Sequence, residues 1–234
     1  MTDENCKKCK GTGWEKVIKN GVELVRRCDC TKTDIRLTKA EKANIPYRFI
    51  SAQLDGYFPD KNYPTQAKAK KTVKKFIDEY PSVTGGLLLQ GPVGVGKTRL
   101  LCTIATELME KFHDIDIYYI DWNDLIREMR SGEEHASRDF DAINQVIQRL
   151  CSVDLLLFDE IGASRMSPWV LDNIYYLFNK RYNNQKVTVC ATNFPDKVTG
   201  NRETLSQRVG ERIRSRLFEM AQTVEIGGKD LRQL

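Results

Sequence analysis

The sequence lacks any apolar stretch that could cross a membrane. Its longest run without charged residues, Tyr80–Gly96, is broken by prolines and glycines and falls short of the roughly 20 apolar residues that a span needs. The first ten residues, MTDENCKKCK, contain acidic residues and no apolar segment, so they do not form a secretion signal. A content of 41% apolar and 29% charged residues excludes collagen-like, mucin-like and wholly disordered chains. The sequence therefore predicts a globular cytoplasmic protein with no membrane partner.

A strong excess of one charge is also missing. Lys and Arg number 37 against 32 Asp and Glu, and the net charge of +5 is carried by residues 1–50. This weakly basic balance permits a nucleic-acid partner without requiring one.

Composition divides the chain into three regions. Residues 1–34 are poor in aliphatic side chains and rich in Cys, Gly and Lys, so this region needs a metal or a partner in order to fold. Residues 35–64 form a mixed connector that we expect to pack on a larger body. Residues 65–234 alternate between helical patterns and fully apolar strand patterns. Such alternation predicts an α/β fold with a parallel sheet and helices on both faces.

Periodicity places the elements of the large region. Apolar runs bounded by turn residues predict five strands, at 86–90, 115–120, 153–158, 187–191 and 222–226. Apolar residues at helical spacing predict helices at 65–80, 98–112, 123–130, 139–150, 168–182 and 203–219. Ser167 and Pro168 supply an N-cap and a first-turn proline for the fifth helix.

A phosphate-binding loop follows the first of these strands. The segment GPVGVGKT fits the pattern G-x-x-x-x-G-K-[ST] and lies between a strand and a helix. Its glycines let the backbone N–H groups surround a phosphate, Lys97 can reach the β- and γ-phosphates, and the Thr98 hydroxyl can bind Mg²⁺. The residues expected to contact a nucleotide are Gly91, Pro92, Val93, Gly94, Val95, Gly96, Lys97, Thr98 and Arg99. The alternative is a Gly-rich turn with a solvated lysine.

A pair of carboxylates ends the apolar strand at 153–158. Asp159 emerges at the carboxyl end of the strand, where ligands bind in open α/β sheets, and can meet the Mg²⁺ held by Thr98. Glu160 can take a proton from an attacking water, which favours hydrolysis over phosphoryl transfer to a metabolite. An ordinary helix N-cap is the alternative for this pair. Asn193, at the end of the next strand, can hydrogen-bond the γ-phosphate or the water, unless it belongs to a simple turn before Pro195.

Several segments of the chain, taken in order, resemble one protein family. They are IPYRFISAQLDGY, GPVGVGKT, LLLFDEIGA, CATN, GERIRSRL and GKDLR. Together they resemble the AAA+ ATPases of the DnaC/DnaI-type replicative helicase loaders and the similar IstB transposition helpers, over about residues 44–234. The resemblance implies an ASCE-type five-stranded sheet, no C-terminal lid domain, and ATP hydrolysis at a boundary between subunits that associate through the ATP site.

Two arginines acquire roles through this resemblance. Arg212 occupies the position of the family's arginine finger, which reaches the γ-phosphate of a neighbouring subunit, and Arg216 is the second candidate. Arg232 resembles the sensor-2 arginine, which contacts nucleotide in the same chain. The spacing of Arg208, Arg212 and Arg216 predicts one row on a single helix. If the resemblance is set aside, the simpler interpretation is that these arginines form a solvated basic face of the helix.

Four cysteines near the N-terminus have the spacing of a metal site. They are Cys6, Cys9, Cys28 and Cys30. Four thiolates hold Zn²⁺ tetrahedrally with no open position, so this zinc would be structural. The segment between the two pairs alternates around Asn20-Gly21, a hairpin signal, and indicates a zinc-ribbon-like module. Two disulfides or an iron–sulfur cluster are the alternatives.

The expected partners follow from the resemblance. Helicase loaders place their N-terminal domain against a hexameric helicase, although nucleic-acid contact by the cysteine module stays open. Related ATPases use the segment after the second strand for single-stranded DNA, here residues 122–150 with Arg127, Arg130, Arg138 and Arg149. The lysine run over 68–75 is an alternative, or simply a solvated face.

Three other functions stay open. One is an IstB-like helper of a DNA transposase, another a P-loop kinase of a small metabolite, and the third a zinc adaptor with negligible ATP turnover.

Overall fold

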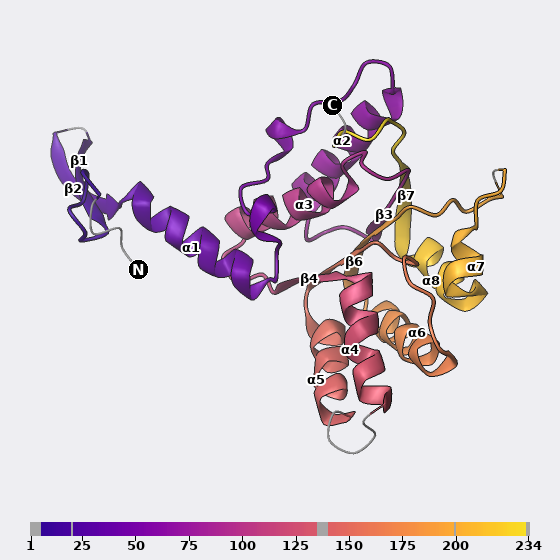
Figure 1. Cartoon of the computed structure of the whole chain (residues 1–234). Helices are drawn as coiled ribbons and strands as arrows, with labels where there is room; N and C mark the ends of the chain where they lie inside the picture. The colour runs from indigo at the N-terminus through magenta and orange to yellow at the C-terminus, as the bar shows by residue number, and fades with distance from the viewer. Residues whose placement is uncertain (1–5, 20, 135–139, 199, 233–234) are drawn as a thin grey trace.

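A five-stranded parallel sheet organises the computed structural model, which describes residues 6–19, 21–134, 140–198 and 200–232. The strands lie in the order β4-β5-β6-β3-β7 (Figure 1), and every neighbouring pair is parallel. They are β3 (Gly86–Gln90), β4 (Ile117–Asp121), β5 (Leu155–Asp159), β6 (Val187–Thr192) and β7 (Ala221–Glu225). The predicted α/β class with a five-stranded parallel sheet is confirmed.

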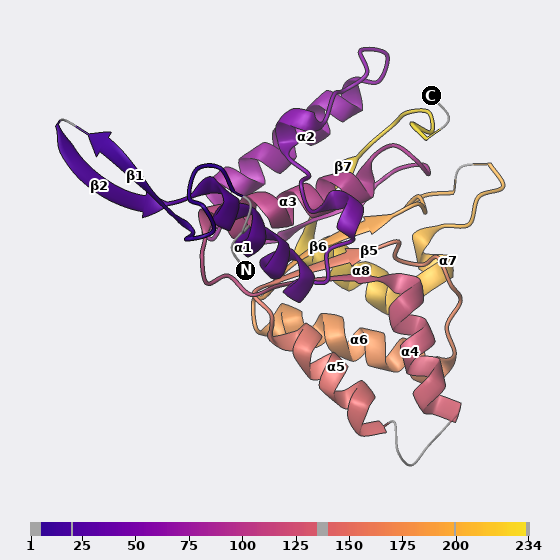
Figure 2. The same ribbon diagram turned by 60° about the vertical axis from the view of Figure 1, so that its left-hand side comes forward.

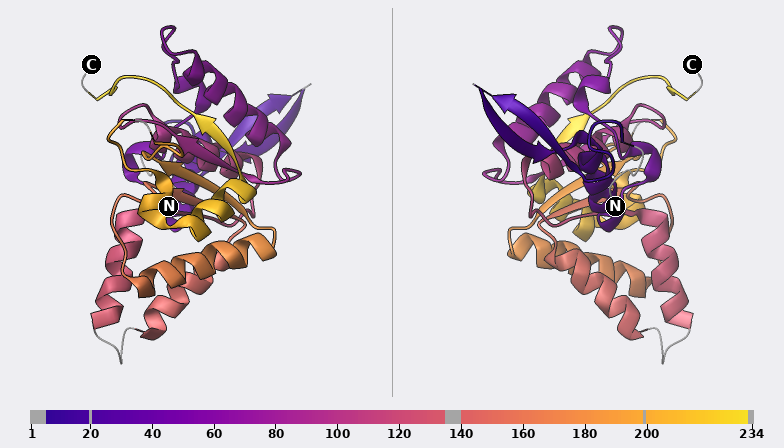
Figure 3. Two further views of the ribbon diagram at one scale, coloured as in Figure 1. Left: turned by 90° about the vertical axis from the view of Figure 1, so that its right-hand side faces the viewer. Right: turned by 90° about the vertical axis from the view of Figure 1, so that its left-hand side faces the viewer.

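Helices cover both faces of the sheet (Figure 3). One face carries α2 (Pro64–Glu79) and α3 (Lys97–Lys111). The other carries α4 (Trp122–Glu134), α5 (Phe140–Ser152), α6 (Pro168–Asn183), α7 (Leu205–Val209) and α8 (Glu211–Met220). Successive residues of a strand alternate between the two cores, so Leu87 and Leu89 face the first group of helices and Leu88 the second. This explains why the strands read as unbroken apolar runs.

One predicted helix is wrong. The helix expected at 203–219 is two helices, because Gly210 adopts φ 80° and ψ 156° between α7 and α8. A capping box formed by Thr204 and Gln207 starts α7, and the Gly210 N–H closes it by donating to Ser206 O. Arg208 therefore belongs to a different helix from Arg212 and Arg216, and the predicted single row of arginines does not exist.

The segment that follows the N-terminal hairpin packs against the core beside α3. Helix α1 (Asp29–Lys42) crosses the predicted boundary between residues 34 and 35, and the short helices η1 (Tyr47–Phe49) and η2 (Leu54–Gly56) follow it. Ala40, Ile45 and Leu54 are buried in the core beside α3. Lys39 Nζ donates to His113 O at 3.0 Å, which holds the C-terminal part of α1 against the end of α3.

The N-terminal hairpin stands away from the sheet (Figures 1 and 2). Strands β1 (Trp14–Lys19) and β2 (Val22–Arg27) pair antiparallel, with Lys19 opposite Val22 in the register. The hairpin leaves large apolar side chains exposed, namely Trp14, Ile18, Val22, Leu24 and Val25. It is joined to the core through α1.

None of the helices in the described part of the chain combines the length and the apolar character that crossing a membrane requires.

Candidate active site

The phosphate-binding loop joins the central strand β3 to α3. Gly94 and Gly96 have φ of 79° and 95°, a left-handed conformation that glycine adopts without steric cost. Lys97 Nζ folds back over the loop and donates to Gly91 O at 2.8 Å and to Pro92 O at 2.6 Å. Only 7% of Lys97 is exposed, and burial lowers its pKa to about 8. The ammonium is thus held over the loop, in the position from which it can meet phosphate oxygens.

A C-terminal segment lies directly against this loop. A Cβ on Gly94 would come within 1.8 Å of Asp230 Oδ1, so only glycine fits there. Leu231 N donates to Gly94 O at 3.1 Å. This contact brings Arg232 near the site, and its positive charge opposes the rise that burial causes in the pKa of Glu160. The structure therefore places Arg232 near the phosphate-binding loop.

Asp159 is buried at the carboxyl end of β5. Its Oδ2 accepts a hydrogen bond from the Tyr119 hydroxyl at 3.0 Å, and its Oδ1 accepts one from Glu160 N at 2.9 Å. Burial raises the pKa of Asp159, while the Thr98 side chain, within hydrogen-bonding reach, acts in the opposite direction. The two residues predicted to bind Mg²⁺, Thr98 and Asp159, are therefore neighbours. A hydroxyl and a carboxylate oxygen are donors that suit this cation.

Glu160 has an unusual backbone conformation for a residue with a side chain. Its φ is 52°, a left-handed value that persists in non-glycine residues only where the surroundings hold it. Burial raises the pKa of its carboxyl, and the nearby charges of Asp159 and Asp121 raise it further. A higher pKa makes a carboxylate a better proton acceptor. These features suit the predicted role as the base that activates water.

Asn193 follows the last residue of β6, which lies between β5 and β3 in the sheet. It therefore sits at the carboxyl edge between the carboxylates and the phosphate-binding loop. Thr192 fixes this corner, because its hydroxyl donates to Ile161 O at 2.9 Å and accepts from Phe194 N. The structure brings Asn193 to the edge where the sequence predicts it.

Two residues of the site escaped the sequence reasoning. Tyr119 lies in an apolar strand and resembles an ordinary core residue, yet its hydroxyl orients Asp159. Asp121 ends β4 directly opposite Asp159 in the register. The sequence does indicate Asp121 as a site residue, since it is a carboxylate at the carboxyl end of a strand, as Asp159 is.

The start of α8 lies at the same edge of the sheet. Arg214 Nε donates to Asp196 Oδ1, in the loop after β6, at 2.6 Å. Arg212 is exposed over the Tyr175 ring and makes no ion pair within the described residues. Arg216, one turn later, is paired with Glu219 at 2.8 Å and lies over the Tyr182 ring. Of the two candidates for the finger, only Arg212 is therefore presented outward without an acidic partner.

Three of the four N-terminal cysteines lie close enough to hold one metal ion. The sulfurs of Cys6, Cys9 and Cys28 lie within 4.8 Å of one another, and Cys6 Sγ and Cys28 Sγ are 3.7 Å apart. Zn–S bonds of about 2.3 Å in a tetrahedron put two sulfurs about 3.8 Å apart, so these residues fit zinc. Cys30 lies in the first turn of α1, and its side chain is outside the described part of the chain.

The predicted DNA-binding residues do not form one group. Arg127 and Arg130 are exposed on α4, and Arg130 Nη2 donates to Arg165 O at 2.5 Å. Arg149 instead pairs with Asp116, which precedes β4 at the amino edge of the sheet. Arg138 is outside the described residues. The lysine run belongs to α2, where Lys74 and Lys75 pair with the acidic residues one turn later.

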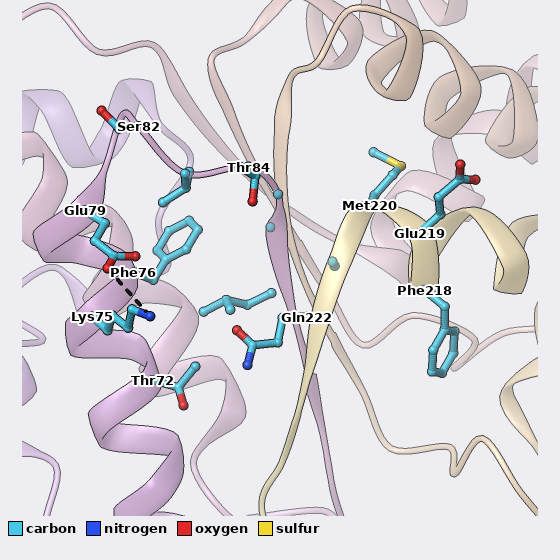
Figure 4. A pocket seen from close by; sticks show the side chains of 15 residues that line it. Thr72, Lys75, Phe76, Glu79, Ser82, Thr84, Phe218, Glu219, Met220 and Gln222 are labelled. Atoms are coloured by element: carbon cyan, nitrogen blue, oxygen red, sulfur yellow. Dashed lines mark ion pairs between the residues drawn. The ribbon is translucent and has the colours of Figure 1, made fainter.

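A groove of about 510 Å³ opens at the amino edge of the sheet, far from the phosphate-binding loop. It lies between α2 and the start of β7 and contains none of the residues predicted to bind nucleotide or metal (Figure 4). The residues predicted to bind the nucleotide and Mg²⁺ lie instead at the carboxyl edge, where parallel strands place their ligands.

Comparison with known proteins agrees with this geometry. Residues 63–218 match the family profile described as the bacterial DnaA ATPase domain. The chain belongs to this ATPase family. As a member of the DnaA ATPase-domain family it is an AAA+ ATPase, which confirms the predicted enzyme class and the resemblance to DnaC/DnaI-type proteins.

Individual relatives of this DnaA-family chain include helicase loaders. The replicative helicase loader DnaI of Bacillus subtilis is 27% identical over 98% of the chain and 76% of its own length. The phage-like element PBSX protein XkdC of the same organism is 25% identical over 92% of the chain and 79% of its own length. A crystal structure of the DnaC helicase loader has a TM-score of 0.64 and 28% identity, covering 77% of this chain and 99% of that one.

Proposed function

We propose that the chain is an ATP-dependent loader of a replicative DNA helicase. The observation that carries this proposal is the meeting of Lys97, Thr98, Asp159 and Glu160 at one edge of the sheet. The similarity to the loader DnaI, over almost the whole chain, supports the helicase as the partner. ATP binding would create the form that holds helicase and single-stranded DNA, and hydrolysis would reset it.

Each residue of the site has a role in this reaction. The loop amides and Lys97 bind the β- and γ-phosphates, and Thr98 and Asp159 would hold Mg²⁺. When bound, that ion neutralises charge on the phosphates as the γ-phosphoryl leaves. Glu160 takes a proton from the attacking water, and Asn193 orients that water or the γ-phosphate. Tyr119 keeps the Asp159 carboxylate aimed at the site.

Arg212 acts on the ATP of a neighbouring subunit in this proposal. Arg212→Ala should bind ATP normally but lose about 10³-fold in turnover, the scale of an arginine finger. Mixing this variant with Lys97→Ala protein should restore part of the activity, because some interfaces then combine an intact loop with an intact arginine. The measurement is steady-state phosphate release by each variant and by the mixture. If Arg216→Ala abolishes turnover while Arg212→Ala does not, the finger is Arg216.

The cysteine module docks on the helicase in this proposal, since its hairpin exposes apolar side chains of the kind that mark protein interfaces. Cys9→Ser should lose bound zinc and co-purification with a hexameric replicative helicase, yet keep ATP turnover within about 2-fold because the AAA+ core forms separately. Zinc content by metal analysis and helicase capture by affinity purification are the two readouts. Cys151→Ser, in a buried thiol of α5, is the control that should keep both. Helicase capture by zinc-free protein would contradict this role.

In this proposal, single-stranded DNA binds to the exposed arginines of α4. The double variant Arg127→Ala/Arg130→Ala should bind DNA about 10-fold more weakly, and the slope of log affinity against log salt should fall by about 1.4, since each phosphate contact contributes about 0.7. Filter binding across a salt series gives both values. Arg149→Ala, whose guanidinium is engaged by Asp116 at the opposite edge, is the matched control. Unchanged affinity and slope in the double variant would exclude α4 as the DNA surface.

A further inference from the structure

The residue proposed as the base opens a tight turn. Ala163 N donates to Glu160 O at 3.0 Å, so the four residues 160–163 form a hydrogen-bonded turn whose first member is Glu160. Glu160 and Gly162 both have positive φ, 52° and 87°. Glycine suits the third position of such a turn, whereas the left-handed conformation of Glu160 persists in a residue with a side chain only where other parts of the molecule hold it.

Arg208 of α7 supplies that support. Its Nε donates to Gly162 O at 2.7 Å and its Nη2 to Ala163 O at 2.8 Å. Its third arm, Nη1, pairs with Glu203 at 3.0 Å, and the guanidinium lies over the ring of Phe194, the residue after Asn193. Only 10% of the side chain is exposed. One guanidinium therefore links the turn that begins at Glu160 to the strand end that carries Asn193.

The approach of the two elements is close. A Cβ on Gly162 would lie 3.1 Å from Arg208 Cβ and 3.2 Å from the Phe194 ring. The glycine thus allows α7 to approach the turn, and the arginine bonds its two successive carbonyls. A planar fork with several fixed donors can bind both carbonyls at once, whereas a lysine ammonium acts as a single point donor.

We propose that Arg208 is a positioning residue for ATP hydrolysis, because it holds the turn that aims the Glu160 carboxylate. The inference rests on the proposed role of Glu160 as the base. The donors of Arg208 are engaged by the turn and by Glu203, so we expect its loss to leave ATP binding intact and to slow the chemical step. A misplacement of a catalytic group by about 1 Å can cost about 100-fold in rate.

The first test measures the effect of each substitution on kcat and on KM separately. Arg208→Ala should lower kcat by about 10- to 100-fold and leave KM and the affinity for a non-hydrolysable ATP analogue within about 2-fold. Arg208→Lys, which keeps the charge and the pairing with Glu203, should recover part of the loss. Arg165→Ala is the matched control, because Arg165 also pairs with Glu203, at 2.7 Å, but is exposed and forms no hydrogen bond to the turn. Melting temperatures of all variants show whether they fold.

A merely structural role predicts a different pattern. Nucleotide affinity and kcat would then fall together with the melting temperature. The activity of Arg208→Lys would depend on its melting temperature and not on whether the lysine bonds the turn. That pattern would overturn the proposal, as would an unchanged kcat in folded Arg208→Ala protein.

The alternative is that Arg208 acts by positioning Arg212, the proposed arginine finger, which lies four residues later in the chain. Mixing experiments separate the two routes. If Arg208 serves its own Glu160, Arg208→Ala mixed with Arg212→Ala should regain activity, because about a quarter of random interfaces join an intact base to an intact finger. Arg208→Ala mixed with Lys97→Ala should show no gain over Arg208→Ala protein alone. The reverse pattern would overturn the proposal and show that Arg208 acts by positioning Arg212.

The mixtures also separate this inference from the proposed function. A mixture of Arg212→Ala with Lys97→Ala that stays inactive would mean that the finger does not act between subunits. The kcat and KM values of the single variants would then decide the role of Arg208 without the mixing data.

Discussion

Lys97→Ala should abolish ATP binding at concentrations that saturate the unmodified protein. The ammonium is held over the phosphate-binding loop by two carbonyls, and its burial has already lowered its pKa to about 8. A phosphate that enters the loop would relieve this cost by giving the charge an anionic partner. Removing one member of such a buried pair weakens binding by about 100-fold or more. Equilibrium titration with a fluorescent ATP analogue measures the effect directly.

The same helix provides a matched control. Lys111, at the other end of α3, also donates to two successive carbonyls, Ile77 O at 2.9 Å and Asp78 O at 3.0 Å. Lys111→Ala removes a lysine with the same type of contact but far from the loop, so it should bind ATP normally. Equal loss in both variants would show that the effect comes from a destabilised α3 and not from phosphate recognition.

Glu160→Gln should bind ATP and fail to turn it over. The amide keeps the size of the side chain but cannot accept the proton of the attacking water. A general base contributes about 10²- to 10⁴-fold to a rate, so we expect kcat to fall by about 10³-fold while the affinity for ATP changes by less than about 3-fold. Loss of the charge also removes repulsion from Asp159 and Asp121, which raise the pKa of this carboxyl. Single-turnover hydrolysis and analogue binding are the two measurements.

Glu225→Gln is the control for this substitution. Glu225 ends β7 at the same carboxyl edge, opposite Gln90 in the register, and is exposed. Its neutralisation tests the effect of losing one negative charge from that edge without touching the proposed base. Hydrolysis by Glu160→Gln at the rate of the Glu225→Gln control would remove Glu160 from the mechanism.

The prediction of the loop and of the carboxylates rests on information that is local in the sequence. The eight residues of GPVGVGKT are consecutive, and the strand and helix that flank them carry clear apolar patterns. Asp159 and Glu160 come directly after a buried strand, whose carboxyl end is the ligand edge of any parallel sheet. Local sequence patterns do not give the order of the strands in the sheet, which only the resemblance implied. This order places β6 and Asn193 between the carboxylates and the loop.

The helix at 203–219 shows where local pattern misleads. Arginines spaced four apart fit a continuous helix, and an interior glycine costs a helix only about 1 kcal/mol. At Gly210 the tertiary contacts of α7 outweigh that preference, because Arg208 is bonded to the turn after β5. Arg208, which the spacing placed in one row with Arg212 and Arg216, is therefore nearly buried, and Arg212 lies in the first turn of a new helix.

The fold class follows from periodicity, and the phosphate-binding loop and the metal-ligand spacing of the cysteines are short motifs of neighbouring residues. Packing alone decided which arginine is exposed, how Tyr119 meets Asp159 and how Arg208 holds the turn of Glu160. These contacts join residues about 40 or more positions apart. No local pattern specifies such a distance, because it depends on how the helices and strands come together on the two faces of the sheet.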